Sequence, residues 1–144
     1  MSHCNILLVE DNLADAMLVV EAFKETGHKN RISHVLNGED AMEYLKRRGV
    51  YAHATEPDFV LLDLNLPRKD GREVLEEIRS DQKLHRLPVI ALTTSEANAD
   101  VLRCYELGAN AYIVKPVEFD KFVAAVQSIG SFWLQTATLP RHRQ

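Results

Sequence analysis

The sequence predicts an α/β domain in which helices cover both faces of a doubly wound, five-stranded parallel sheet. Short β-rich apolar runs alternate five times with segments of helical periodicity. Such an alternation implies right-handed crossovers, which place helices on both sides of the sheet. Most of these runs are followed by polar or charged residues, and open α/β sheets bind their ligands at the carboxyl ends of their strands. The fold class therefore also predicts where a functional site lies.

The chain is organised around the run at residues 58–67, which is Asp-Phe-Val-Leu-Leu-Asp-Leu-Asn-Leu-Pro. A nearly continuous apolar run that ends in a carboxylate and is then interrupted by proline indicates a buried parallel strand. This strand delivers Asp63 to the carboxyl edge of the sheet. Asp63 is therefore a candidate reactive group.

The first strand is expected at residues 5–9, where Ile, Leu and Val predominate. Glu10 and Asp11 follow it, and Asn12 is a favoured N-cap residue for the helix that comes next. The apolar stripe of that helix consists of Leu18, Val19, Ala22 and Phe23. Asp15 lies one turn beyond Asp11, and we expect its side chain to face solvent rather than border a pocket.

Residues 32–36 predict a second, weaker strand. The Asn-Gly pair at 37–38 turns the chain into a helix over residues 39–47. Residues 49–57 form the longest connection before the central strand, and we interpret them as a surface loop.

Beyond the central strand, turn residues at 68–71 open a third helix. Its buried side is expected to consist of Val74, Leu75 and Ile78. Residues 87–93 predict the fourth strand, which ends in the polar Thr93, and residues 96–107 predict the fourth helix.

Residues 111–116 predict the fifth strand, with Lys115 near its end, and the last helix begins near Glu118. We expect residues 1–130 to form one domain and residues 131–144 to extend the last helix and form a tail. Phe132 and Trp133 in that extension add apolar area beyond the domain, which favours a symmetric dimer over simple back-folding.

Composition excludes several classes of protein. The 144 residues suit one domain, and the formal net charge of −4 argues against a broad cationic face for nucleic acid. No apolar run approaches the ~20 residues of a membrane span, and the first residues do not form a signal peptide, so we expect a cytoplasmic protein. Cys4 and Cys104 are far apart and lack metal-site spacing, which favours buried free thiols.

The predicted strand ends bring Glu10, Asp11, Asp63, Thr93 and Lys115 to one edge of the sheet. Three clustered carboxylates are costly to keep ionised without a cation, and oxygen ligands of this kind suit Mg²⁺. Lys115 can contact a phosphoryl oxygen, and Thr93 can donate a hydrogen bond to the same group. A carboxylate can attack phosphorus to form an aspartyl phosphate, so Asp63 is the predicted nucleophile.

Four motifs occur in order along the chain: Glu10-Asp11, Asp63, Thr93-Thr94 and Lys115-Pro116. In type and order they resemble those of the receiver domains of two-component response regulators, over about residues 5–129. The resemblance implies a flavodoxin-like strand order of 2-1-3-4-5. It further implies that Asp63 is phosphorylated, that Asp11 and Asp63 bind the metal directly, that Glu10 binds it through water, and that Asn65 adds its backbone carbonyl.

The same resemblance implies roles for the later strand ends. Thr93 would follow the phosphoryl group inward, Tyr112 would be the aromatic switch residue, Lys115 would bridge to the phosphoryl oxygens, and Pro116 would follow in a cis peptide bond. The resemblance also implies that a dimer would form through the fourth helix, fifth strand and fifth helix. A tyrosine in the position of Tyr112, taken alone, is more often a half-buried strand aromatic than a switch residue. Such a domain is not an enzyme in the ordinary sense, but a Mg²⁺-dependent phosphoacceptor that assists its own phosphorylation and dephosphorylation.

Residues 63–75, the loop at 49–57 and the segment at 131–140 look like those of the small response regulators that serve cyanobacterial phytochromes. This resemblance implies a sensor histidine kinase, a phytochrome, as the phosphodonor. No helix-turn-helix or enzymatic segment follows the domain in this sequence, so we expect the output to pass through a partner protein or a change in the dimer, with no direct contact to nucleic acid or membrane.

One alternative to this role stays open, and two others are disfavoured by the sequence. A receiver that serves as a phosphate sink or shuttle has the same motifs. A phosphatase with an aspartate nucleophile would require a second acid where this chain has Asn65. A flavodoxin-like nucleotide binder would require hydroxyls and glycines after the first strand, whereas Glu10 and Asp11 repel an anion unless a metal intervenes.

Overall fold

The computed structural model describes residues 4–25, 29–94, 97–115, 119–132, 138 and 140, and the side chain of Phe119 lies outside this description. The strands are β1 (Cys4–Val9), β2 (Asn30–Val35), β3 (Phe59–Asp63), β4 (Val89–Thr93) and β5 (Ala111–Val114). The helices are α1 (Leu13–Lys24), α2 (Gly38–Leu45), the 3₁₀ turn η1 (Gly49–Tyr51), α3 (Gly71–Ser80), α4 (Asn98–Glu106) and α5 (Phe119–Gly130).

Within these residues the strands form one parallel sheet in the order β2-β1-β3-β4-β5, which confirms the predicted fold class and strand order. The register pairs Asp63 with Leu92 and Thr93 with Val114. The ends of β3, β4 and β5 are thereby brought level with one another. Residues that follow these strands consequently share one edge of the sheet.

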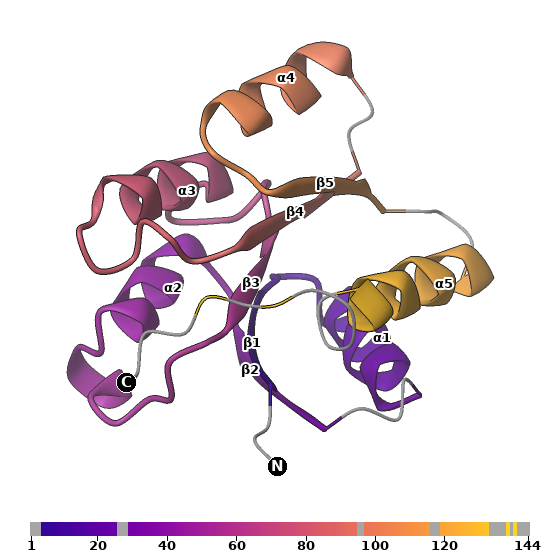
Figure 1. Ribbon diagram of the computed structural model, residues 1–144, viewed down its shortest axis with the longest axis horizontal. Helices are drawn as coiled ribbons and strands as arrows, with labels where there is room; N and C mark the ends of the chain where they lie inside the picture. Colours follow the sequence, from indigo (N-terminus) through magenta and orange to yellow (C-terminus); the bar gives the residue numbers. More distant parts are fainter. Residues whose placement is uncertain are drawn as a thin grey trace.

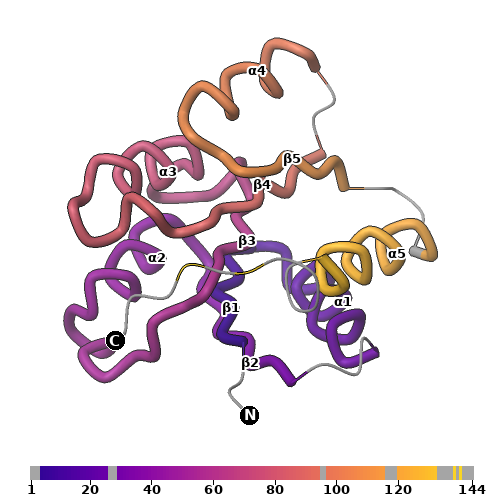
Figure 2. The backbone as a smooth tube through the Cα atoms, viewed as in Figure 1, coloured from indigo at the N-terminus to yellow at the C-terminus, as the bar shows by residue number. Residues whose placement is uncertain are grey.

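Helices cover both faces of the sheet (Figure 1). One core contains apolar side chains of α1 and α5, and the other contains those of α2 and α3 together with Cys104 of α4. Successive residues of β1 and β3 alternate between these two cores, and every residue of both strands is buried. Burial on both faces explains why these strands appear in the sequence as continuous apolar runs. Figure 2 shows α1 and α5 side by side although most of the chain separates them.

Side-chain caps fix where the helices begin. The Asn12 side chain accepts the backbone N–H of Asp15 at 3.0 Å at the start of α1, and Asn37 accepts that of Asp40 at 2.8 Å at the start of α2. A capping box joins Asp70 and Glu73 at the start of α3. Since α1 and α3 start just beyond β1 and β3, these caps also fix the loops that carry Asp11 and Asn65.

Several predicted boundaries were wrong by one or two residues. The second strand ends at Val35 rather than at residue 36, and Leu36 is 46% exposed. The second helix ends at Leu45, because Arg47 adopts a left-handed conformation with φ of 55° and closes the helix. The backbone N–H of Arg48 then donates to the carbonyl of Glu43 at 2.9 Å, and the loop that follows contains η1.

Some predictions fall outside the described residues. They are the cis bond before Pro116, the placement of Trp133 and most of the extension from residue 131 onward. Phe132 is described and is 52% exposed. Cys4 and Cys104 are buried free thiols, as predicted. Among the described helices, none combines the length and the apolar character that crossing a membrane requires.

Gly71 allows the first turn of α3 to approach the end of β3. Its N–H donates to the carbonyl of Leu64 at 3.0 Å, and a Cβ at this position would collide with the carbonyl oxygen of Asp63 and lie 2.7 Å from the Cα of Leu64. Both atoms belong to backbone that cannot move without shifting Asp63. We therefore expect Gly71→Ala to lower the free energy of unfolding by about 2–3 kcal/mol, measured by urea denaturation.

The matched control is Gly49→Ala. A Cβ on Gly49 would meet no atom within 4 Å, so only its φ of 55° opposes the substitution. We expect this variant to lose about 1 kcal/mol or less. Equal losses for the two variants would contradict the importance of the close approach at Gly71.

Candidate functional site

The predicted site residues meet at the carboxyl edge of the sheet. Asp63 and Thr93 are the last residues of β3 and β4. Glu10 directly follows β1, and Lys115 directly follows β5. Asp11 lies between Glu10 and the cap of α1. The parallel register, which no local pattern encodes, brings these four strand ends together.

The carboxylates of Glu10, Asp11 and Asp63 form an acidic cluster, with one oxygen of each lying within 4.8 Å of the others. Glu10 and Asp63 are buried, whereas Asp11 is exposed at the mouth of the cluster. Three carboxylates at this spacing, open to solvent on one side, form a donor set that suits a hard divalent cation. The predicted metal ligands therefore fit such an ion.

Lys115 lies at the centre of this cluster. Its Nζ donates to Glu10 Oε1 at 2.5 Å, to Asp15 Oδ2 at 3.0 Å and to Asp63 Oδ2 at 3.2 Å. Burial alone would lower the pKa of Lys115, but the hydrogen bond to Glu10 and the charge of Asp63 outweigh burial and raise that pKa above its ordinary value. The ammonium is therefore charged at neutral pH, and it neutralises part of the acidic cluster.

Glu10 is the carboxyl group of the cluster that has a raised pKa. Burial and the hydrogen bond with Asp63 raise its pKa, the hydrogen bond with Lys115 lowers it, and the net result is a pKa of about 7. Near neutral pH the cluster therefore retains a proton that one unit of additional positive charge would displace. This is the electrostatic signature expected of a site that binds a cation.

Asp15 belongs to the site, contrary to the expectation that it faces solvent. Its carboxylate accepts a hydrogen bond from Lys115, and its side chain is 30% exposed. The sequence indicated only that Asp15 lies in the first turn of the helix that follows Glu10 and Asp11. Local spacing could not predict that Lys115, which is 100 residues further along the chain, lies next to Asp15.

Asn65 links the ends of β3 and β4. Its backbone N–H donates to Asp63 Oδ1 at 3.0 Å, which orients that carboxylate, and its Nδ2 donates to Thr93 Oγ1 at 3.4 Å. Thr93 is fully buried. Tyr112 is half-buried and packs against the core beneath α2 and α3, which agrees with a strand aromatic. Its switching role stays a prediction.

His34 is a site neighbour that the sequence did not indicate. Its Nε2 lies 2.7 Å from the carbonyl oxygen of Glu10, so this nitrogen carries the proton and donates. The backbone N–H of Glu10 donates to the carbonyl of Val35, the residue after His34, at 3.1 Å. The end of β2 thus holds the backbone of Glu10 through two contacts. The six histidines are scattered in the sequence, and nothing local marks this one.

Comparison with known proteins agrees with this geometry. Residues 6–127 match the family model of the response regulator receiver domain. The response regulator Rcp1 of a Synechocystis species is 46% identical over 135 residues, which cover 94% of this chain and 92% of Rcp1.

Two solved structures are similar throughout. The phosphorylated cyanobacterial phytochrome response regulator RcpA superposes with a TM-score of 0.93 at 47% identity, covering 97% of this chain and all of RcpA. The Mn²⁺-bound form of Rcp1 superposes with a TM-score of 0.92 at 45% identity, covering 96% of this chain and 99% of Rcp1. The chain therefore belongs to the response regulator receiver domain family and is related to the phytochrome response regulators.

Proposed function

We propose that this protein accepts a phosphoryl group on Asp63 from a sensor histidine kinase and signals through the change that follows. The observation that carries this proposal is the position of the Asp63 carboxylate, which lies 3.2 Å from the ammonium of Lys115 and within the acidic cluster. A nucleophile, a cation for the incoming phosphoryl oxygens and a set of metal ligands are thus present together. Phosphoryl transfer depends on positioning and on neutralising charge, and this arrangement provides both.

Mg²⁺ is the metal that we propose for the cluster. Glu10, Asp11 and Asp63 would hold it through their carboxylates, with the backbone carbonyl of Asn65 as a further ligand, and Glu10 would act through water. The proximity of the three carboxylates and the Mn²⁺-bound form of Rcp1 support a divalent ion. When bound, the ion neutralises negative charge on the oxygens of the transferring group.

In the transfer step, an oxygen of Asp63 attacks the phosphorus of a phosphohistidine. The new P–O bond forms as the P–N bond breaks, and the electron pair of the P–N bond stays on the imidazole nitrogen. Lys115 exchanges one of its carboxylate partners for a phosphoryl oxygen. The hydroxyl of Thr93 donates a hydrogen bond to another phosphoryl oxygen. Tyr112 then moves together with Thr93.

The donor that we propose is a phytochrome-type histidine kinase in the cytoplasm. The similarity to RcpA and Rcp1 supports this choice. The output that we propose is a change in a partner or homodimer surface formed by α4, β5 and α5, within residues 1–130 and the extension at 131–144. Leu102, Tyr105 and Phe132 expose apolar area there, with 57%, 48% and 52% of their surfaces accessible.

A phosphotransfer assay tests this function. A phytochrome kinase is first labelled on its histidine with radioactive ATP, the nucleotide is removed, and this protein is then added with Mg²⁺. We expect the label to move from the kinase to this chain within seconds to minutes, and we expect no transfer in metal-free buffer. Label that stays on every phytochrome kinase tested, but moves from another class of histidine kinase, would overturn the phytochrome assignment and leave the phosphoacceptor role intact.

The exposed face of α1 beside the site is the surface that we expect the kinase to contact. Leu13 and Met17 are 61% and 67% exposed, and they line a shallow cleft of about 370 Å³ with His34 at its edge. Exposed apolar side chains of this kind, grouped beside an active site, mark an interaction surface. We expect Met17→Lys to slow transfer from the kinase about tenfold or more, while labelling by a small phosphodonor is unchanged.

Val50→Lys is the matched control, because Val50 is 94% exposed in η1, away from the acidic cluster. We expect this variant to accept phosphate at the wild-type rate from both donors. If Met17→Lys lowered labelling by both donors equally, the substitution would be acting on the site itself and not on docking.

A further inference from the structure

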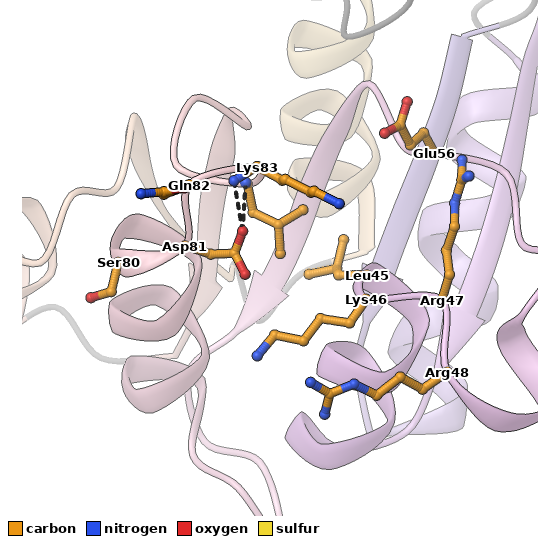
Figure 3. A pocket seen from close by; sticks show the side chains of 10 residues that line it. Leu45, Lys46, Arg47, Arg48, Glu56, Ser80, Asp81, Gln82 and Lys83 are labelled. Carbon is orange, nitrogen blue, oxygen red and sulfur yellow. Dashed lines mark hydrogen bonds between the residues drawn. The ribbon is translucent and has the colours of Figure 1, made fainter.

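A second cleft, lined by four cationic residues, lies away from the acidic cluster. Figure 3 shows its two walls, which are the C-terminal end of α2 with the residues after it, and the segment that follows α3. Its volume is about 640 Å³, which is within the range of pockets that bind small molecules. The cationic residues that line it are Lys46, Arg47, Arg48 and Lys83. Four of the 17 lysines and arginines of an acidic chain are thus gathered in one cleft.

Two of these cations already have partners. Lys46 Nζ lies 2.7 Å from Glu77 Oε2, and Arg48 Nη1 lies 3.5 Å from Glu43 Oε2. Arg47 and Lys83 form no ion pair with any residue that the structure describes. Two free cations therefore approach the cleft from opposite walls, one from the end of α2 and the other from the segment after α3.

Two carboxylates also line the cleft, and neither forms an ion pair with Arg47 or Lys83 within the described part of the chain. Asp81 Oδ1 accepts the backbone N–H groups of Lys83 at 2.7 Å and Leu84 at 3.1 Å, so this carboxylate serves to fix the segment after α3 (Figure 3). Glu56 belongs to the opposite wall. The formal charges of the cleft and of the partners of Lys46 and Arg48 therefore balance, and what distinguishes the cleft is that the ammonium of Lys83 and the guanidinium of Arg47 are not held in ion pairs.

The backbone of Arg47 provides a second, independent observation. Its φ of 55° lies in the left-handed region at the position just after a helix end, where glycine is the usual residue. The N–H of Arg47 donates to the carbonyl of Tyr44 at 3.1 Å, as this type of helix end requires. The chain thus holds an arginine where glycine would be less strained, and the arginine side chain lines the cleft. A strained residue in a cleft is an observation from which function is reasonably inferred.

We propose that this cleft binds a small anion that carries a diphosphate group. Guanidinium groups bind phosphate oxygens through two parallel hydrogen bonds, and Lys83 adds a point charge from the facing wall. The cleft is larger than a single phosphate requires. A nucleoside diphosphate and inorganic pyrophosphate share this chemistry. The proposal does not depend on phosphorylation of Asp63.

The test is a titration of the ¹⁵N-labelled protein, followed by amide chemical shifts in metal-free buffer at physiological salt. The probes are ADP, pyrophosphate and adenosine. We expect ADP to shift the amides of residues 46–48 and 80–84 saturably, with Kd below about 1 mM, and adenosine to shift none of them. Pyrophosphate binding as tightly as ADP would identify the diphosphate alone as the ligand, and tighter binding of ADP would identify a nucleotide. Shifts confined to the region of Asp63, or no saturable shift, would overturn the proposal.

Variants distinguish specific binding in this cleft from general electrostatic attraction of anions to the protein. We expect Arg47→Gly to raise the Kd about tenfold while the unfolding temperature is unchanged or higher, because glycine relieves the left-handed strain. Lys83→Gln should weaken binding similarly without altering that helix end. Arg31→Gln removes an exposed cation of β2 outside the cleft and should change the Kd less than twofold. Equal weakening by Arg47→Gly and Arg31→Gln would contradict a specific site.

Discussion

Replacing Asp63 by asparagine is expected to reduce phosphoryl labelling of this chain to background. The amide has nearly the same shape as the carboxylate, and it keeps an oxygen for the backbone N–H of Asn65, which donates to Asp63 Oδ1 at 3.0 Å. What the variant loses is the negatively charged nucleophile and one metal ligand. The measurement is the intact mass of each protein after incubation with Mg²⁺ and a small-molecule phosphodonor.

The control for loss of one negative charge is Asp120→Asn, since Asp120 is exposed on α5. This variant should gain one phosphoryl group to the same extent as the wild type. Two results would contradict the assignment of Asp63: an unmodified wild type under conditions that label another receiver domain, or an Asp63→Asn variant that gains the same added mass. Circular dichroism of both variants checks that the fold is retained.

Replacing Lys115 by methionine is expected to produce the largest loss of stability in metal-free buffer. The Lys115 side chain is only 8% exposed, and its ammonium contacts the carboxylates of Glu10, Asp15 and Asp63. Removing one member of a buried ionic network leaves the remaining charges uncompensated, which costs about 3 kcal/mol. Urea denaturation near pH 7 measures this loss. Mg²⁺ should restore more stability to the variant than it adds to the wild type, because the ion replaces the missing charge.

The loss of stability in Lys115→Met is expected to depend on pH because Glu10 titrates near neutral pH. Its folded-state pKa of about 7 exceeds its ordinary value of 4.5, so the folded state holds this proton more tightly than the unfolded state does. The wild type therefore loses stability from this group as the pH rises from about 4.5 to 7. Lys115 opposes the upward shift, and its removal raises the pKa of Glu10 further. The stability difference between Lys115→Met and the wild type should therefore widen between pH 5 and pH 8.

Lys24→Met is the matched control for this prediction. Lys24 pairs with Glu21 at 3.3 Å on the surface of α1, and its side chain is 67% exposed. Exposed pairs of this kind contribute little, so the variant should change the free energy of unfolding by less than about 0.5 kcal/mol at any pH in the range. If Lys115→Met were as stable as the wild type without metal, the ammonium would not be neutralising the cluster in the way inferred above.

The sequence predicted most of the fold because its local signals agree with one another. The runs that become β1 and β3 are buried on both faces, and this gives them a continuous apolar pattern that few other structures share. Asn12 was recognisable as a cap, and Asn37 and Asp70 as members of the turns before the second and third helices, because these signals depend on a residue and its near neighbours. Element boundaries were less accurate where a helix ends at a residue other than the usual one. Arg47 ends α2 in the left-handed conformation that glycine usually adopts.

The sequence alone determined which groups stand at the ends of the strands. Glu10, Asp11, Asp63, Thr93 and Lys115 each follow or end an apolar run, and this local property identified them as a candidate site. Only the tertiary structure decided how they meet. It joined Lys115 to three carboxylates, brought Asp15 and His34 to the cluster, and placed Arg47 across a cleft from Lys83. The physical reason is that periodicity and capping act over a few residues, whereas these contacts join residues tens of positions apart, and their distances exist only once the strands have paired in register.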